Sequence, residues 1–219
     1  MTAPKRSQAA RERLLDTAER LFAEAGIEGA SLRQIAALSG QANNSVVQYH
    51  FGDKAGLLRE IIERRVAGFE PRRRLLLEDA GQRGRLRDIR TLLEILFLPI
   101  AELTDDRGRH VYARFMMHFM SSFRYQAKIE HPGWAPDSAA TKAALLVAQN
   151  LPFLPPAELQ KRINWVGGMF FNALLERDNA AEYEEQEPEG LFLNALFSMM
   201  TAAISVPPIV RKMPPSQAR

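Results

Sequence analysis

The chain has 219 residues, of which 46% are hydrophobic and 25% are charged, and its formal net charge is only +3. These proportions are ordinary for a globular protein, and a chain of this length can bury a sizeable core as one large domain or two small ones. The absence of cysteine excludes disulfides, thiolate metal sites and thiol redox sensing, and it fits a reducing compartment.

Neither a secretory signal nor a membrane span is expected. Residues 1–13 lack the apolar core that a signal peptide needs. The longest mainly apolar window, residues 191–204, is 14 residues long, which is shorter than the ~20 needed to cross a bilayer. We therefore expect a cytoplasmic protein that does not insert into a membrane.

Three helices are predicted within the first 52 residues. The first ends at Gly26 and carries one apolar face, formed by Leu14, Ala18, Leu21, Phe22 and Ala25. The second begins at Ser31, because Ser31-Leu32-Arg33-Gln34 has the form of a capping box, and it ends at Gly40. The third runs from about Asn43 to Gln48 and is too short to bury much on its own, which favours contact with a partner. Two short helices joined by a glycine-containing turn predict a helix-turn-helix, whose second helix enters the DNA major groove.

The order and spacing of these pieces resemble the TetR family of bacterial transcriptional repressors. The matching segments, within residues 10–62, are LLDTAERLFAEAG, SLRQIAALSG and YHFGDKAGLL. The resemblance implies an all-α fold of about nine helices, with an N-terminal three-helix helix-turn-helix DNA-binding domain over residues 1–52. It further implies a helical C-terminal effector-binding (ligand-binding) and dimerisation domain over residues 53–206. The proline-rich tail, residues 207–219, is expected to be disordered.

The same resemblance implies a mechanism. A homodimer would bind a palindromic double-stranded DNA operator. A small-molecule effector would release it by moving the helix that joins the ligand pocket to the DNA-contacting helix. No cofactor is implied. Repression is the expected outcome, although some relatives activate.

The groove-reading segment departs from the family pattern. Members commonly carry a basic residue and a further aromatic where this chain has Gln41-Ala42-Asn43-Asn44-Ser45-Val46-Val47-Gln48. Because Asn and Gln pair bidentately with adenine whereas Arg favours guanine, we predict a preference for A·T pairs. The predicted DNA-binding residues are Ser31, Arg33, Gln41, Asn43, Asn44, Ser45, Gln48, Tyr49, His50 and Lys54.

Residues 1–60 hold eight basic and seven acidic side chains, so their net charge is small. Attraction to DNA phosphates therefore depends on where the basic side chains lie. Lys54, at a helix start, is expected to contact phosphate on the strength of the family position. The run Arg72-Arg73-Arg74 is interpreted as a solvated helix face.

Beyond residue 52 the sequence predicts six helices separated by breakers. Asp53 is expected to cap the first of them, which is expected to bend near Pro71. The predicted ranges are about 53–80, 85–103, 109–128, 138–150, 157–179 and 188–204.

Two of the later segments suggest functions. The last two helices are strongly apolar, and the family resemblance implies that they pair with a second subunit through Ile163, Val166, Phe170, Leu174, Phe192, Leu196 and Met199. The helix at 109–128 suggests one wall of an apolar or aromatic ligand site, formed with Phe97 by Tyr112, Phe115, Met116, His118, Phe119 and Ser122. Met and Phe at this spacing are more usually core, and a lone His there is usually a satisfied core residue.

Rival classes find less support. The sequence has no G-x-S-x-G, G-x-x-x-x-G-K or H-E-x-x-H motif, and its four histidines have no metal-ligand spacing, so we predict neither an enzyme nor a metal site. A helical protein-interaction adaptor remains the alternative, because composition alone does not distinguish it from a regulator.

Overall fold

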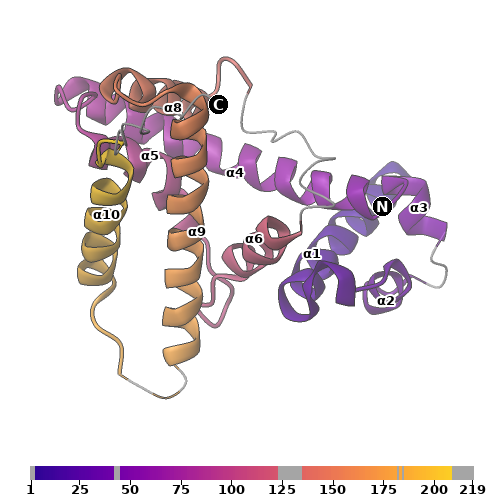
Figure 1. Ribbon diagram of the computed structural model, residues 1–219. Helices are drawn as coiled ribbons and strands as arrows, with labels where there is room; N and C mark the ends of the chain where they lie inside the picture. Colours follow the sequence, from indigo (N-terminus) through magenta and orange to yellow (C-terminus); the bar gives the residue numbers. More distant parts are fainter. Residues whose placement is uncertain (1–2, 42–44, 123–134, 182, 184, 209–219) are drawn as a thin grey trace, which may run out of the picture.

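The structure is a computed structural model that describes residues 3–41, 45–122, 135–181, 183 and 185–208. Within these ranges the chain forms helices and no strand, so the predicted all-α fold is confirmed. Figure 1 shows α1, α2 and α3 gathered at one end, α5, α8, α9 and α10 at the other, and α4 running between them. The helices are α1 (Ala3–Gly29), α2 (Leu32–Leu38), α3 (Ser45–Phe51), α4 (Lys54–Gln82), α5 (Ile89–Ala101), α6 (Val111–Ser121), α8 (Ala139–Asn150), α9 (Pro156–Ala180) and α10 (Glu189–Ser205).

Side-chain caps fix several helix starts. Ser31 Oγ accepts from the Gln34 N–H at 3.2 Å while Gln34 Oε1 accepts from the Ser31 N–H at 2.9 Å, which is the predicted capping box. Asp53 caps α4 by accepting from the Gly56 N–H at 2.8 Å, as predicted. Ser138 caps α8 in the same manner, through the Thr141 N–H. The caps at Ser31 and Asp53 are local in sequence, which is why pattern alone located them.

Other helix ends differ from the prediction. The third helix continues through Phe51 rather than ending at Gln48. α5 begins four residues later than predicted, because Asp88 caps it by accepting from the Arg90 N–H. α6 begins after His110, whose backbone N–H donates to Asp178 of α9 at 2.7 Å. α4 is one helix through Pro71, as predicted, but it ends at Gln82 rather than at about Ala80. Three predicted features lie outside the described residues. They are Asn43 and Asn44, the extension of α6 over residues 123–128, and most of the tail (209–219).

A single apolar core runs through both halves of the molecule. It includes Leu14 and Phe22 of α1, Ile61 of α4 and Phe115 of α6, all fully buried. The Phe22 and Phe115 rings lie 6.3 Å apart, so the end formed by α1, α2 and α3 packs directly on the body. Among the described residues no helix is both long and apolar enough to cross a bilayer.

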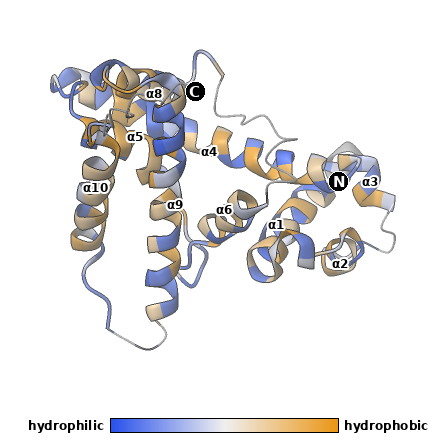
Figure 2. Ribbon diagram, viewed as in Figure 1, coloured by the Kyte–Doolittle hydropathy of each residue, from blue (hydrophilic) through white to orange (hydrophobic). Residues whose placement is uncertain are grey.

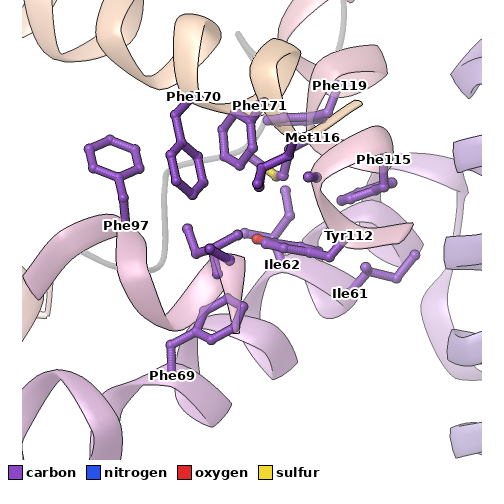
Figure 3. Close-up of a cluster of buried hydrophobic side chains, with 14 of the residues drawn as sticks. Ile61, Ile62, Phe69, Phe97, Tyr112, Phe115, Met116, Phe119, Phe170 and Phe171 are labelled. Atoms are coloured by element: carbon purple, nitrogen blue, oxygen red, sulfur yellow. The ribbon is translucent and has the colours of Figure 1, made fainter. Parts of the chain in front are cut away.

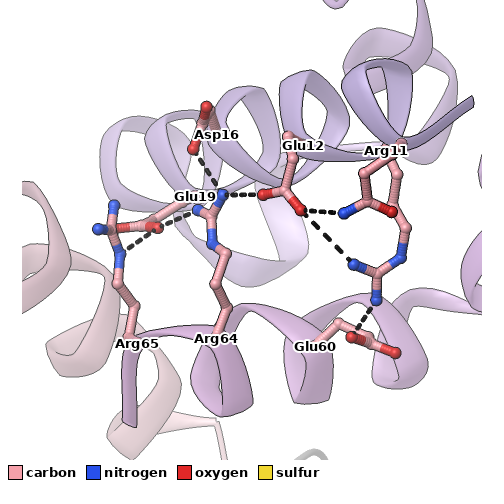
Figure 4. Close-up of polar contacts among 8 residues, drawn as sticks. Arg11, Glu12, Asp16, Glu19, Glu60, Arg64 and Arg65 are labelled. Atoms are coloured by element: carbon pink, nitrogen blue, oxygen red, sulfur yellow. Dashed lines mark hydrogen bonds and ion pairs between the residues drawn. The ribbon is translucent and has the colours of Figure 1, made fainter. Parts of the chain in front are cut away.

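Ion pairs around a buried carboxylate join α1 to α4 (Figure 4). Glu19, 1% exposed, receives Arg64 Nη2 at 3.1 Å and Arg65 Nε at 2.9 Å. Arg64 also reaches the exposed Asp16 at 2.7 Å. Burial opposes the charge of Arg64, but hydrogen bonding and attraction from Asp16, Glu19 and Glu12 outweigh it and raise the pKa of this guanidinium. The cluster therefore holds α1 at a set angle along α4.

Removing the buried charge at the centre of this cluster is expected to destabilise the protein strongly. Glu19→Gln leaves two guanidinium groups without their buried partner, and a loss of about 3 kcal/mol in the free energy of unfolding is expected. Asp16→Asn is the matched control, because this carboxylate binds the same arginine but is 58% exposed, and its loss is expected to stay below about 1 kcal/mol. Urea unfolding at neutral pH measures both, and equal losses would contradict the central role of Glu19.

Candidate DNA-binding surface and ligand cavity

A tight turn follows the short helix α2. Gly40 adopts φ +75°, a left-handed conformation that favours glycine, directly after α2. On α3, Val47 and Phe51 are buried in the core, whereas Ser45, Gln48 and Tyr49 face outward. The helix thus buries its apolar side and leaves a polar and aromatic side exposed.

The predicted DNA-binding residues divide into outward-facing and supporting groups. Arg33, Ser45, Gln48 and Tyr49 are exposed, and Gln41 and His50 are half-buried. His50 lies between aromatic neighbours, with its ring 5.2 Å from Tyr49 and 5.8 Å from Phe51. Ser31 is exposed, and its hydroxyl serves the capping box.

Lys54 has a contact that the sequence did not indicate. Its ammonium donates to the carbonyl of Ile27 at 2.8 Å and ties the start of α4 to the end of α1. Ile27 follows Gly26, where φ +76° and ψ 166° interrupt the helix. The two partners are 27 residues apart, so only the tertiary fold brings them together.

A cavity of about 560 Å³ lies in the body of the molecule, lined by five helices. Figure 3 shows the aromatic cluster around it, with Phe69 from α4, Phe97 from α5, Tyr112, Met116 and Phe119 from α6, and Phe171 from α9. Trp165 also lines it, beside Gln160 and Asn164, whose amides hydrogen-bond to each other at 3.1 Å. The volume suits a small organic molecule.

Only part of the predicted ligand wall faces this cavity. Phe97, Tyr112, Met116 and Phe119 line it, whereas Phe115, His118 and Ser122 are absent from its lining. Phe115 packs on Phe22 of α1, and the His118 ring lies near Gly26, where an added Cβ would be 3.6 Å from Nδ1. The side of α6 that carries Phe115 and His118 therefore faces α1, and the adjoining side lines the cavity, with the Phe115 ring stacked on Tyr112 and Phe119.

The solvated interpretation of the arginine run is wrong for Arg73. This side chain lines the cavity and is only 6% exposed, whereas Arg72 and Arg74 are exposed. Arg72 pairs with Glu102 of the neighbouring loop at 2.7 Å. The sequence signal that would have identified Arg73 is its helical spacing from Val66 and Phe69, which line the same cavity.

Most of the residues predicted for the subunit interface are core residues of the chain itself. Val166, Phe170, Leu174 and Leu196 are buried, and the Phe170 ring lies 5.1 Å from Phe97 and 6.2 Å from Phe197. Ile163 is half-buried and lines the cavity, Phe192 is half-buried with the Arg177 guanidinium 4.7 Å from its ring, and Met199 is exposed. The exposed large apolar residues of the last two helices and the residue after them are Trp165, Met169, Leu191, Met199 and Val206.

The chain's own carboxylates and histidines form no triad that could hold a metal ion within the described ranges. Comparison with known proteins locates the relationship at the DNA-binding end. Residues 14–61 match the family model described as bacterial regulatory proteins, tetR family. No curated protein matches the chain.

Replacing Lys54 tests whether this residue supports the fold. Lys54→Met removes the bond to Ile27, and we expect the free energy of unfolding to fall by about 1–2 kcal/mol, as for other charged hydrogen bonds. Arg33→Met, at an exposed position of α2, is expected to leave stability within about 0.5 kcal/mol. Chemical denaturation of both variants provides the comparison. A stability loss confined to Arg33→Met would contradict the structural role of Lys54.

Proposed function

Since residues 14–61 form the N-terminal helix-turn-helix domain of the TetR family of bacterial regulators, we propose that this DNA-binding regulator is a homodimeric repressor released by a small ligand. The observation that carries the proposal is the two-sided α3, which buries Val47 and Phe51 and exposes Ser45, Gln48 and Tyr49. A short helix with an unburied polar side is suited to reading base edges. Its place of action would be the cytoplasm, where it meets the chromosome.

The last two helices support dimerisation. On α10 and just beyond it, Leu191, Ala195, Met199, Ala202 and Val206 are exposed at spacings of three and four residues, which places them on one helical face. Figure 2 shows that α10 is hydrophobic along most of its length. A second copy covering this face would remove it from water. Two subunits would then present their α3 helices about one DNA turn, ~34 Å, apart on a palindromic operator.

The contacts of α4 and α6 support coupling between ligand and DNA. Tyr112, Met116 and Phe119 of α6 line the cavity, while Phe115, stacked between Tyr112 and Phe119, packs on Phe22 of α1. A ligand that displaces α6 therefore acts on the helix that carries the DNA-binding end. Ten-fold release from DNA requires a ligand preference of about 1.4 kcal/mol for the released state.

The α4 helix offers a second route for the same coupling. It begins beside the DNA-binding end, where Lys54 bonds to Ile27, and its later turns line the cavity through Val66, Phe69 and Arg73. The same helix thus touches both proposed sites.

A gel shift against the intergenic DNA beside the protein's own gene tests the function, with unrelated competitor DNA and several salt concentrations. A discrete, competitor-resistant complex is expected. Binding lost to competitor or moderate salt would indicate phosphate attraction alone. An adaptor protein would give no specific complex with any genomic fragment.

Tyr49 is expected to contribute to operator binding. Tyr49→Ala removes a side chain that is 84% exposed, so stability is expected to hold while operator affinity falls by about 1–3 kcal/mol, or roughly five- to 150-fold. The matched control is Tyr183→Ala, which removes an 85% exposed tyrosine between α9 and α10. Quantitative gel shifts with both variants measure the difference in operator affinity. Equal affinities would mean that Tyr49 does not contribute to operator binding.

The proposed dimer is tested by a charge placed on its apolar face. Met199→Glu on α10 is expected to shift the protein from dimer to monomer, because a buried unpaired carboxylate opposes association. Leu145→Glu on α8 is the matched control, since both native side chains are 56% exposed. Light scattering at micromolar concentration gives the mass, and a monomeric wild-type protein would refute the dimer.

A further inference from the structure

We infer that the cavity binds an apolar carboxylic acid, with its carboxylate against Arg73 and its hydrocarbon body among the aromatic rings of α4, α5, α6 and α9. The inference rests on the proposed function, because it names the chemical class of the effector for the same cavity. Its basis is the charge and the partners of the cavity lining.

Arg73 is a buried cation that has no carboxylate partner among the described residues. Its Nη2 and Nε donate to the Leu96 carbonyl at 2.9 and 3.3 Å, and its guanidinium lies 5.3 Å from the centre of the Phe69 ring. Within the described part of the chain, no Asp or Glu lies within ion-pair distance of it. A guanidinium carries five N–H donors, and these bonds leave the Nη1 pair and one Nη2 donor for another acceptor.

The acid that attracts Arg73 does not neutralise its charge. Glu70 attracts Arg73, but its Oε1 accepts from the Ala139 N–H at 2.7 Å and lies 3.4 Å from Arg74. Burial lowers the pKa of Arg73, and the attraction from Tyr112 and Glu70 does not fully offset it. Because arginine titrates so far above neutrality, the group stays charged in the cell. Its buried charge is thus compensated incompletely by the chain.

The other residues of the cavity lining indicate the chemistry of the rest of the ligand. Among the described residues no Asp or Glu lines the cavity, and the formal charge that they contribute to it is positive. Most of its surface is aromatic or aliphatic, including Phe97, Phe119, Phe171 and Ile163. An anionic head on a long or fused apolar body fits this division, because a carboxylate and a guanidinium form paired, charge-assisted hydrogen bonds.

Tyr112 supplies a second polar group at the same wall. Its oxygen points into the cluster in Figure 3. Burial is the main cause that raises the pKa of Tyr112, with Glu19 adding to it, so the phenol keeps its proton. A protonated phenol can donate to a carboxylate and gains nothing comparable from a purely hydrocarbon ligand.

The competing interpretation gives Arg73 only a structural role, in which its bonds to Leu96 fasten α4 to α5. Both interpretations predict that replacing Arg73 affects the protein. They differ in whether the effect depends on the charge of the ligand, which is the quantity to measure.

The experiment compares probes that share a body and differ in charge. The full-length protein is titrated by calorimetry with decanoate against decanamide, and with 2-naphthoate against 2-naphthamide. In at least one pair we expect the carboxylate to bind ten-fold or more tightly than its amide. Arg73→Gln is expected to abolish that preference while retaining amide binding, and Arg73→Lys to keep part of it. Arg74→Gln, at the exposed neighbouring position, is expected to behave as wild type.

Several outcomes would overturn the inference. They are equal binding of acid and amide by the wild-type protein, tighter binding of both amides, no binding of either carboxylate at millimolar concentration, or equal loss of acid and amide binding in Arg73→Gln. Circular dichroism checks that the variants fold, and the wild-type comparison needs no variant. Operator release is measured separately by gel shift. Selective carboxylate binding without release from DNA would refute the proposed effector role and leave the ligand class intact.

Discussion

The buried Glu19 carboxylate between Arg64 and Arg65 is the contact on which the arrangement of the two halves depends. α1 and α4 are the longest helices of the described chain at its DNA-binding end, and their relative angle decides where α2 and α3 point. Two helices that pack through apolar side chains alone can slide along each other, whereas directional ion pairs to a buried carboxylate oppose such sliding. The charge cluster therefore converts a hydrophobic contact into a defined orientation.

α6 has two packing faces with different partners. One face carries Tyr112, Met116 and Phe119 into the cavity, and the other places Phe115 against Phe22 and His118 near Gly26. Its first turn is fixed by Asp178, which accepts from the His110 backbone at 2.7 Å and lies 2.7 Å from its Nδ1. The His110 Nε2 lies 3.1 Å from the Ala101 carbonyl, so this residue joins α5, α6 and α9 at one point. α6 is thus anchored at its start and lies between the proposed ligand site and the DNA-binding end.

Arg73 gives the cavity its positive charge, although its two neighbours in sequence are exposed to solvent. Arg72 and Arg74 are exposed, while Arg73 between them is buried, because successive helical residues point about 100° apart and α4 is covered by α5 on one side only. The consequence is a positive group inside an apolar wall, which is uncommon unless something pairs with it.

The sequence by itself determined the features that arise from local bonding and motif spacing. The capping box at Ser31, the cap at Asp53, the all-α class and the helix-turn-helix follow from residues within a few positions of one another. The apolar stripes of α6 and α9 were also visible in the pattern. Only the tertiary structure decided which way each stripe faces, because a helix that is apolar on most of its circumference has several possible buried faces. That is why Phe115 proved to face α1, Phe170 to pack inside the protomer, Lys54 to bond to Ile27 and Arg73 to line the cavity. These contacts join residues 23 or more positions apart, and no local periodicity encodes such a distance.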